Sequence, residues 1–377
     1  MRRPLCRIVF GVSALALFAL ASRGQAAKPD DTIRAAVMSH AYDLTRNGRD
    51  FLLFEAKSAD YFLLGELHGD NEIPQFIHEI WPEMWKRGYL HIAAEISPWT
   101  AHQLETGPPG TAADIQGLWT RKQAVDVHRF ASPKTAVLWG CDMEEIHPEF
   151  LIEELARLNP SNTSVAQMKD ITKDGYRRDV AARLLLLLHK GKISQDEIVN
   201  DISLQQNLAA TLEIDLNRSN PESKMSAQNE REILMKTQFL VHLRMQKPNS
   251  KLFLRFGRNH LHRGYDARGV STLGNFIVEF GLSQNQKTFN VGAFGAGGQA
   301  TLMGETFSAD ERGDELAFDY LAQQAKYPAT VFDLRPLRPL LHAIPQEKRS
   351  PLEVNLLYWA DAYDALICYK NVTPLQN

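Results

Sequence analysis

Short apolar runs recur along this chain, and stretches with helical spacing separate most of them. Gly, Pro, Asp or Asn bound most of the runs, which is typical of strand ends. Strands that alternate with helices favour a largely parallel sheet that is covered by helices on both faces. The sequence therefore predicts an α/β fold, with strands at residues 61–64, 90–94, 135–139, 251–256, 288–294, 330–334 and 365–369.

The centre of the chain has a different pattern. From about residue 163 to residue 246 there are almost no strand signals, and apolar residues recur at helical spacing among charged ones. Asn220-Pro221 interrupts this stretch. We interpret it as an all-helical cap inserted in a single α/β domain that spans residues 28–377, and we expect the cap to cover the strand ends.

Residues 1–27 have the pattern of a secretory signal peptide. Arg2 and Arg3 come first, an apolar stretch covers residues 8–21, and small residues follow at 26 and 27. The apolar stretch is too short for a membrane-spanning helix, and no later stretch approaches the required length. We expect a periplasmic or secreted protein without stable membrane insertion after cleavage; an uncleaved anchor is the alternative.

Charge and cysteine content narrow the possible partners. Cleavage after residue 27 removes four arginines and no acidic residue, so the formal net charge moves from −3 to −7. A mildly acidic protein lacks the basic surface that nucleic-acid binding requires, so we expect a small-molecule or peptide substrate instead. Cys141 and Cys368 remain, and both lie in or just after apolar runs. They are expected to be buried thiols, and a disulfide between them cannot be inferred from sequence.

The first predicted strand ends in a carboxylate and an imidazole, Glu66 and His68, just before a helix begins. In an open α/β sheet, ligands bind at the carboxyl ends of the strands. Residues two apart on an extended backbone point the same way, so both side chains could face one pocket. A carboxylate beside an imidazole fixes its tautomer and raises its basicity, as a general base or a metal ligand requires. The alternative is a capping loop with a packed histidine.

Two further strand ends carry polar side chains. Glu95 follows the apolar run 90–94, and a buried acid there needs a partner. Arg258, Asn259 and His260 follow the run 251–256, and His260 is a better candidate than His262, which is as readily a surface loop residue. The alternative reading of Glu95 is a salt bridge that holds the end of the sheet.

Other motifs carry less weight. Arg231 and Glu232 lie in the last cap helix, where a charged stretch is by itself typical of a solvated face. The glycine-rich residues 292–298 follow a late strand and are interpreted as a turn or rim loop. There is no Gly-x-Ser-x-Gly elbow, no Gly-x-Gly-x-x-Gly and no phosphate-binding loop, so a serine hydrolase or a nucleotide-binding protein is unsupported.

Taken in order, these motifs resemble the superfamily of erythromycin esterase-like, Tiki-like and ChaN-like proteins. The similarity rests on Gly65-Glu66-Leu67-His68, on Glu95, on Arg231-Glu232 with Met235, and on residues 257–260. Residues 272–276, 288–298 and 363–367 are similar to the esterase branch. A single residue separates Glu66 from His68, as in the haem-binding branch.

The resemblance and the residues together favour a hydrolase of an ester, lactone or amide bond. His68 would act as a general base on water, with Glu66 orienting it and Glu95 holding the water or a metal ion. His260 would be the partner acid, and Arg231 and Arg258 would stabilise the oxyanion.

Three alternatives stay open at this point. In a metal-assisted version, typical of a Tiki-like peptidase, Glu66, His68, Glu95 and His260 would bind a divalent ion. The ChaN-type resemblance implies a haem-binding or haem-uptake protein, which needs an axial ligand and an apolar slot. The third is an inactive scaffold that keeps the fold to bind a partner.

Overall fold

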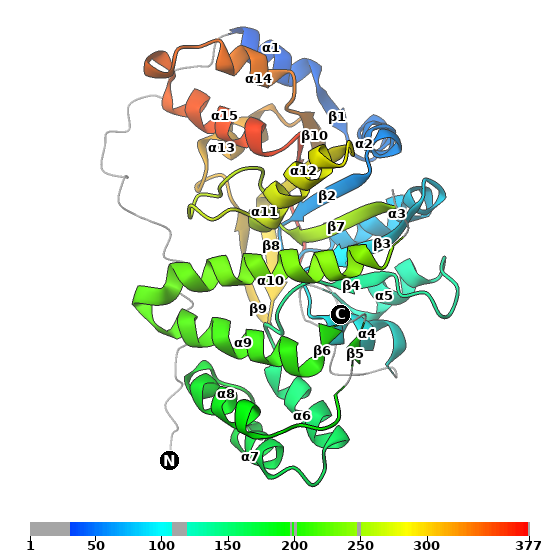
Figure 1. Ribbon diagram of the computed structural model, residues 1–377. Helices are drawn as coiled ribbons and strands as arrows, with labels where there is room; N and C mark the ends of the chain where they lie inside the picture. The colour runs from blue at the N-terminus through cyan, green and yellow to red at the C-terminus, as the bar shows by residue number, and fades with distance from the viewer. Residues whose placement is uncertain (1–30, 108–118, 197, 200–201, 247–249, 376–377) are drawn as a thin grey trace, which may run out of the picture.

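The computed structural model describes residues 31–107, 119–196, 198–199, 202–246 and 250–375. These residues form an α/β fold around a largely parallel nine-stranded sheet, in the order β1-β10-β11-β8-β2-β7-β3-β4, with β9 paired to β8 (Figure 1). Neighbours from β11 to β4 are parallel, whereas β1, β10 and β9 each pair antiparallel. The predicted fold class is confirmed. The strands are β1 (Ala41–Asp43), β2 (Tyr61–Glu66), β3 (Tyr89–Ala94), β4 (Leu138–Gly140), β7 (Lys251–Gly257), β8 (Thr288–Leu302), β9 (Glu305–Asp310), β10 (Ala329–Asp333) and β11 (Ala365–Tyr369).

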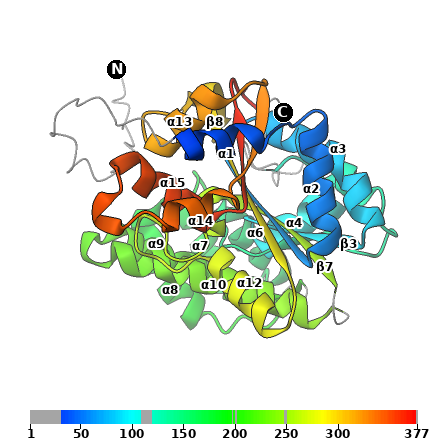
Figure 2. The same cartoon turned by 90° about the horizontal axis from the view of Figure 1, so that it is seen from above.

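Apolar side chains on both sides explain why the central strands are buried. On one side of β2 and β7, Phe62, Leu64 and Phe253 pack under helices α2 (Asn47–Ser58), α3 (Glu72–Lys86) and α5 (Arg121–His128). On the other side, Leu63 and Leu254 pack under α10 (Lys224–Arg244) and α12 (Leu273–Ser283). Figure 2 shows the two helical layers on opposite sides of the sheet. A strand buried on both faces reads as a continuous apolar run, which is why these strands were predictable.

Helices also cover the half of the sheet that contains β8, β10 and β11. Phe294, Phe332 and Leu366 of these strands form a separate apolar core. The covering helices are α1 (Asp31–Ser39), α13 (Leu316–Gln324), α14 (Leu337–His342) and α15 (Pro351–Ala362). Helix α15 begins with a capping box between Ser350 and Glu353.

The turn into α3 fixes the chain just after the first candidate site residues. Gly69 has a φ of 85°, and a Cβ at this position would lie 2.4 Å from the carbonyl oxygen of Thr301 in β8. The turn therefore requires glycine. The Asp70 carboxylate then accepts the Ile73 N–H at 2.7 Å and caps the helix. Burial raises the pKa of Asp70 to about 7.

The helical segment between β4 and β7 lies below the sheet in Figure 1. It contains α6 (Pro148–Leu158), α7 (Thr163–Thr172), α8 (Ala181–Lys190), α9 (Leu204–Ser219) and α10, with the short turns η1 (Arg178–Val180) and η2 (Pro221–Ser223). Helices α6 to α9 share an apolar core of their own. An antiparallel pair of two-residue strands, β5 (Ile198–Val199) and β6 (Ile202–Ser203), is an exception to the all-helical pattern expected there.

Several details differ from the sequence-based expectations. Residues 292–298 are not a rim loop but part of β8, which continues past the sheet to pair with β9. Gly295 permits this close pairing, because a Cβ there would lie 2.2 Å from the Ala309 carbonyl oxygen. His262 is 4% exposed and packs against Tyr358, so it is not a surface residue. Strands β1 and β9 were not predicted, since β1 is short and β9 is largely exposed.

Cys141 and Cys368 are buried free thiols, as expected. None of the helices in the described ranges is long and apolar enough to cross a membrane. The predicted signal peptide, residues 1–27, lies outside the described residues.

Candidate active site

Three adjacent strands bring the candidate residues to one edge of the sheet. Strand β7 lies between β2 and β3, and all three run parallel. Glu66 ends β2 opposite Gly257, which ends β7, and Glu95 follows β3. Parallel strands place their carboxyl ends together, so residues distant in sequence become neighbours here.

The Glu95 carboxylate lies at the centre of the site. Its Oε2 accepts the Gly257 N–H at 2.6 Å, and its Oε1 accepts Nη2 of Arg231 at 2.9 Å. His68 Nε2 lies 3.4 Å from Oε2, and His260 Nε2 lies 3.3 Å from Oε1. Both histidines predicted from the sequence therefore meet the same carboxylate.

Each histidine is also bound to a second carboxylate on its other ring nitrogen. His68 Nδ1 lies 3.0 Å from Glu66 Oε1, and His260 Nδ1 lies 2.5 Å from Glu232 Oε1. The result is an unbroken row in which carboxylates and imidazoles alternate. We call it the carboxylate–imidazole chain; its members are Glu66, His68, Glu95, His260 and Glu232.

The outer carboxylates are themselves held in place. Arg255 Nε lies 2.5 Å from Glu66 Oε2, and the Leu273 N–H donates to Glu232 Oε2 at 2.7 Å. Among the five members of the carboxylate–imidazole chain, only His68 is appreciably accessible. Its side chain is 23% exposed, against 8% or less for the other four. Water or a substrate would therefore reach the chain at His68.

The charges of the carboxylates set the protonation of both imidazoles. Burial opposes protonation of His68, but the charge of Glu95 and the hydrogen bond to Glu66 outweigh it and raise the pKa of His68 to about 10. Burial also opposes protonation of His260, and Glu95 and Glu232 raise its pKa to about 9. Burial alone would raise the pKa of Glu95, but the two imidazoles hold it well below its usual value. Both histidines are thus cationic at neutral pH in the unliganded protein.

Arg231 joins the helical segment to this site. Its guanidinium binds the Asp142 carboxylate as well as Glu95, and it lies 3.8 Å from Glu145. Asp142 follows β4 and is 1% exposed. Arg231 and Glu232 therefore lie on the buried side of α10, so the interpretation of a solvated charged face is wrong. The reason is that buried acids on β3 and β4 supply the partners that a helix face alone does not reveal.

Arg258 faces a different environment. Its Nη2 donates to Glu311 at 2.6 Å and its Nη1 to the Ala293 carbonyl oxygen at 2.5 Å. The guanidinium also lies over the rings of Phe318 and Trp359, at 4.8 and 5.3 Å. The structure therefore brings together five of the six predicted site residues, and the guanidinium of Arg258 is bound elsewhere.

Three residues of the site were not predicted as site residues from the sequence: Arg255, Asp142 and Glu232. Of these, Glu232 was named only as part of a motif. Arg255 had a detectable signal, since a charged residue inside the apolar run 251–256 needs a buried partner. Asp142 follows β4 as Glu95 follows β3, so the rule for strand ends could have found it.

The side chains at this site do not fit the metal alternative, and the haem alternative stays a prediction. No group of three or more His, Cys, Asp or Glu side chains is arranged to hold a metal ion in the part of the chain that the structure describes. Both ring nitrogens of His68 and of His260 face carboxylate oxygens. Glu95 is moreover already bound to the Arg231 guanidinium, which would repel a cation. No step is therefore assigned to a metal.

Gly257 offers a first test of this geometry. A Cβ at this position would lie 2.7 Å from His68 Nε2 and 3.1 Å from Glu95 Oε2. Gly257→Ala is expected to push His68 away from Glu95 and, in the hydrolase proposed below, to lower kcat/KM by about tenfold to a hundredfold, because small displacements of catalytic groups are costly. Steady-state kinetics would measure this. The matched control is Gly313→Ala, whose Cβ has nothing within 4 Å; equal activity of the two variants would contradict the geometry.

Comparisons with known proteins place the fold. No family model and no curated protein matches the chain. Solved structures do match: a protein from Bacillus cereus (TM-score 0.58, 16% identity, 92% of this chain and 98% of that chain) and a succinoglycan biosynthesis protein (0.57, 14%, 91% and 97%). A histidine-to-asparagine mutant of the erythromycin esterase EreC in its open conformation also matches (0.58, 14%, 86% and 94%).

These likenesses extend over nearly the whole described chain, so the overall architecture is shared. The protein has the fold of the erythromycin esterase EreC, as the motifs implied. At 14–16% identity the comparison establishes the fold, and the chemistry has to be argued from the side chains of this protein.

Proposed function

We propose that the protein hydrolyses an ester, lactone or amide bond by activating water at His68, without a serine nucleophile. The observation that carries the proposal is the carboxylate–imidazole chain, in which two imidazoles share Glu95 at the carboxyl ends of three parallel strands. Perturbed titratable groups that converge in this way are typical of catalytic sites. The fold it shares with an esterase is consistent with this reaction class.

In the proposed reaction, neutral His68 takes a proton from water through Nε2. The water oxygen attacks the carbonyl carbon, and Arg231 stabilises the oxyanion that forms. The carbon–oxygen or carbon–nitrogen bond then breaks, and protonated His260 supplies a proton to the leaving group. The proton that His68 took from water then passes to His260 through Glu95, which lies between them, so both imidazoles return to their starting states. Glu66 holds the Nδ1 proton of His68 and so keeps Nε2 available. Arg258 is left out because its guanidinium is bound to Glu311, whereas that of Arg231 contacts Glu95 in the carboxylate–imidazole chain.

The role of Glu95 is electrostatic in this scheme. It stabilises the cationic form of His68 after proton transfer, and it keeps His260 protonated until the leaving group departs. Helices α7 to α10 are proposed to act as a cap, because Arg231 of α10 reaches directly into the site. The partial exposure of His68 would allow a small molecule or a peptide to reach it as substrate.

The pKa values predict an alkaline optimum. His68 must lose its proton, and its pKa is raised to about 10, whereas His260 must keep its proton, and its pKa is raised to about 9. kcat/KM should therefore rise by about tenfold per pH unit from pH 7, reach its maximum between the two values, and then fall. A pH profile on a panel of esters, lactones and amides would measure this; no hydrolysis of any of them would refute the proposed function.

Glu66→Gln tests whether His68 is the base. Loss of the negative charge beside Nδ1 disfavours protonated His68, so the pKa of His68 should fall in an NMR titration, and kcat/KM should decrease less at pH 7 than at its maximum. An equal decrease at both pH values would show that another group is the base.

We also propose that the protein acts in the bacterial periplasm. The support is the charged, apolar and small pattern of residues 1–27. Cell fractionation with a cytoplasmic marker would test it, and a wholly cytoplasmic protein would contradict it.

A further inference from the structure

A buried arginine in the middle of the sheet carries an inference beyond the reaction itself. Arg255 lies in β7, within the apolar run Leu252, Phe253, Leu254, and is 3% exposed. A guanidinium is almost never fully buried unless it is paired. The contacts of Arg255 therefore indicate why this position is charged.

Register explains which carboxylate Arg255 meets. Leu64 pairs with Arg255 and Glu66 with Gly257, so Arg255 and Glu66 are diagonal neighbours on adjacent strands. Both side chains point to the face that α3 and α5 cover, as Leu64 and Phe253 do. The result is the 2.5 Å contact between Arg255 Nε and Glu66 Oε2.

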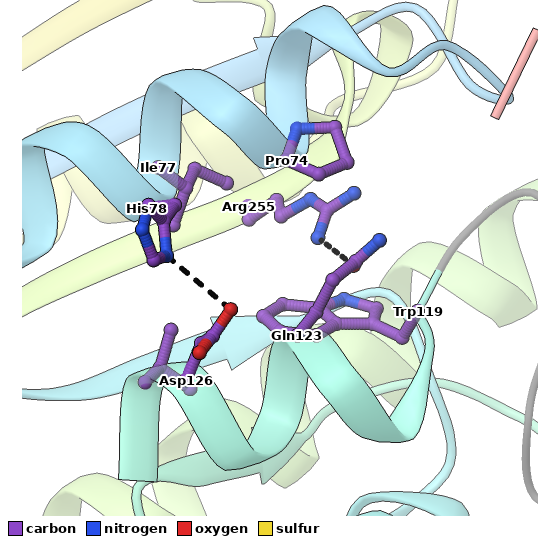
Figure 3. A pocket seen from close by; sticks show the side chains of 8 residues that line it. Pro74, Ile77, His78, Trp119, Gln123, Asp126 and Arg255 are labelled. Carbon is purple, nitrogen blue, oxygen red and sulfur yellow. Dashed lines mark hydrogen bonds and ion pairs between the residues drawn. The ribbon is translucent and has the colours of Figure 1, made fainter. Parts of the chain in front are cut away.

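Two other groups fix the guanidinium from the side of α5. Arg255 Nη1 donates to Gln123 Oε1 at 3.0 Å, and the guanidinium lies 4.4 Å from the centre of the Trp119 ring (Figure 3). A planar guanidinium can stack on a ring and bind in its plane at the same time, which an ammonium cannot. Trp119 and Gln123 thus hold the orientation in which Nε faces Glu66.

We propose that Arg255 is a positioning residue for His68, acting through Glu66. With Oε2 of Glu66 bound to Arg255, Oε1 is left facing His68 Nδ1 at 3.0 Å. The ring of His68 is then oriented with Nε2 toward Glu95. The inference rests on the proposed function for its catalytic meaning, but the geometry of Glu66 and His68 can be tested without a substrate.

A pocket beside Arg255 makes a direct test available. Its volume is about 20 Å³, room for about one water molecule, and Pro74, Ile77, Trp119, Gln123 and Arg255 line it. His78 also lines the pocket (Figure 3), and its side chain is 49% exposed, so the pocket lies close to solvent. Removal of the Arg255 side chain would enlarge the pocket into a space that a free guanidinium ion can enter and fill.

The experiment is Arg255→Ala with and without guanidinium ion at a concentration far below denaturing. The readout is the Nδ1 proton resonance of His68 in histidine-labelled protein, assigned by its loss in His68→Ala. A proton shared with a carboxylate resonates far downfield. Arg255→Ala should lose this resonance and about tenfold to a hundredfold of kcat/KM, and added guanidinium should restore both.

Arg335→Ala is the matched control. Like Arg255, Arg335 is paired and stacked: it binds the carboxylates of Asp333 and Glu55 and lies over the rings of Phe51 and Phe289. None of these four residues belongs to the carboxylate–imidazole chain. Arg335→Ala should leave the His68 resonance and the activity unchanged. If Arg255→Ala does not fold, Arg255→Lys is measured instead; it keeps the charge and should lose the bond to Gln123 together with most of the activity.

Each outcome decides whether Arg255 positions His68 through Glu66. An unchanged His68 resonance in a folded Arg255 variant overturns the inference, whatever the activity. Guanidinium that restores thermal stability without restoring the resonance also overturns it, because Arg255 would then be structural only. If no substrate is hydrolysed, the proposed function fails, but loss and recovery of the resonance would still support the positioning role.

Discussion

His68→Ala should lower kcat by about a hundredfold or more on any substrate that the wild-type protein hydrolyses. The expectation follows from its position, because His68 is the accessible member of the carboxylate–imidazole chain. Steady-state kinetics with a verified ester, lactone or amide would measure the loss. Stability should also fall, because Glu66 and Glu95 lose a shared partner, but by less than in a variant of Glu95, since the His68 ring is 23% exposed.

His147 offers a close control for the His68→Ala variant. His147 Nδ1 lies 3.1 Å from Glu149 Oε1, so it too is an imidazole paired with a carboxylate two residues away in sequence. His147 lies at the start of α6 and does not belong to the carboxylate–imidazole chain. His147→Ala should retain wild-type kcat. A His68→Ala protein as active as His147→Ala would remove His68 from the mechanism.

Glu95→Gln should have an effect of similar size on activity and a larger one on stability. The substitution keeps the shape but leaves two imidazoles and the Arg231 guanidinium without their shared negative charge. Removal of one partner from a buried ionic network costs about 3–5 kcal/mol. The pKa values of His68 and His260 should both fall, because the charge of Glu95 is the strongest influence that raises each of them.

Two measurements check this variant. Histidine titration by NMR should show both pKa values lowered, and kcat/KM should fall by about a hundredfold to ten-thousandfold. Glu105→Gln is the control, because Glu105 is also buried, accepts the N–H groups of Val137 and Leu138, and lies outside the network. Burial raises the pKa of Glu105 to about 7, so a neutral side chain should be tolerated there. Unshifted histidines in Glu95→Gln would contradict the assigned geometry.

The charge balance of the site explains why these two positions matter most. Three carboxylates alternate with two imidazoles, and guanidinium groups from Arg255 and Arg231 bind the first and the third member of the row. Such a network is stable only when each member has its partners. Removal of the central acid therefore affects both histidines at once, whereas removal of His68 exposes one end.

Some parts of the fold and site could be predicted from short stretches of sequence. The apolar runs gave the seven main strands because parallel strands are buried on both faces. Glu66, His68, Glu95 and His260 were found because each follows such a run, where the sheet ends.

Other residues could not be placed from the local sequence pattern, since their partners are distant in sequence. Arg231 and Glu232 look like a solvated helix face until α10 packs against the sheet, where Arg231 meets Glu95 and Asp142 and Glu232 meets His260. The sequence gives Arg258 the same predicted role as Arg231. In the structure its guanidinium is bound instead to Glu311, which follows β9. The glycines of residues 292–298 resemble a loop in sequence because their close backbone contacts come from distant segments: β9 at Gly295, and residues 370 and 372 at Gly297 and Gly298.

Local sequence patterns were enough to predict the layered α/β class and the positions where strands end in acids and imidazoles, because burial and backbone periodicity are local properties. The contacts among these acids and imidazoles depend on how the elements pack in space. Strand order places β7 between β2 and β3, and α10 packs over them, so five side chains from four segments meet in one row. Hydrogen bonds and charges act over a few ångströms in space, and separation along the chain says little about that distance.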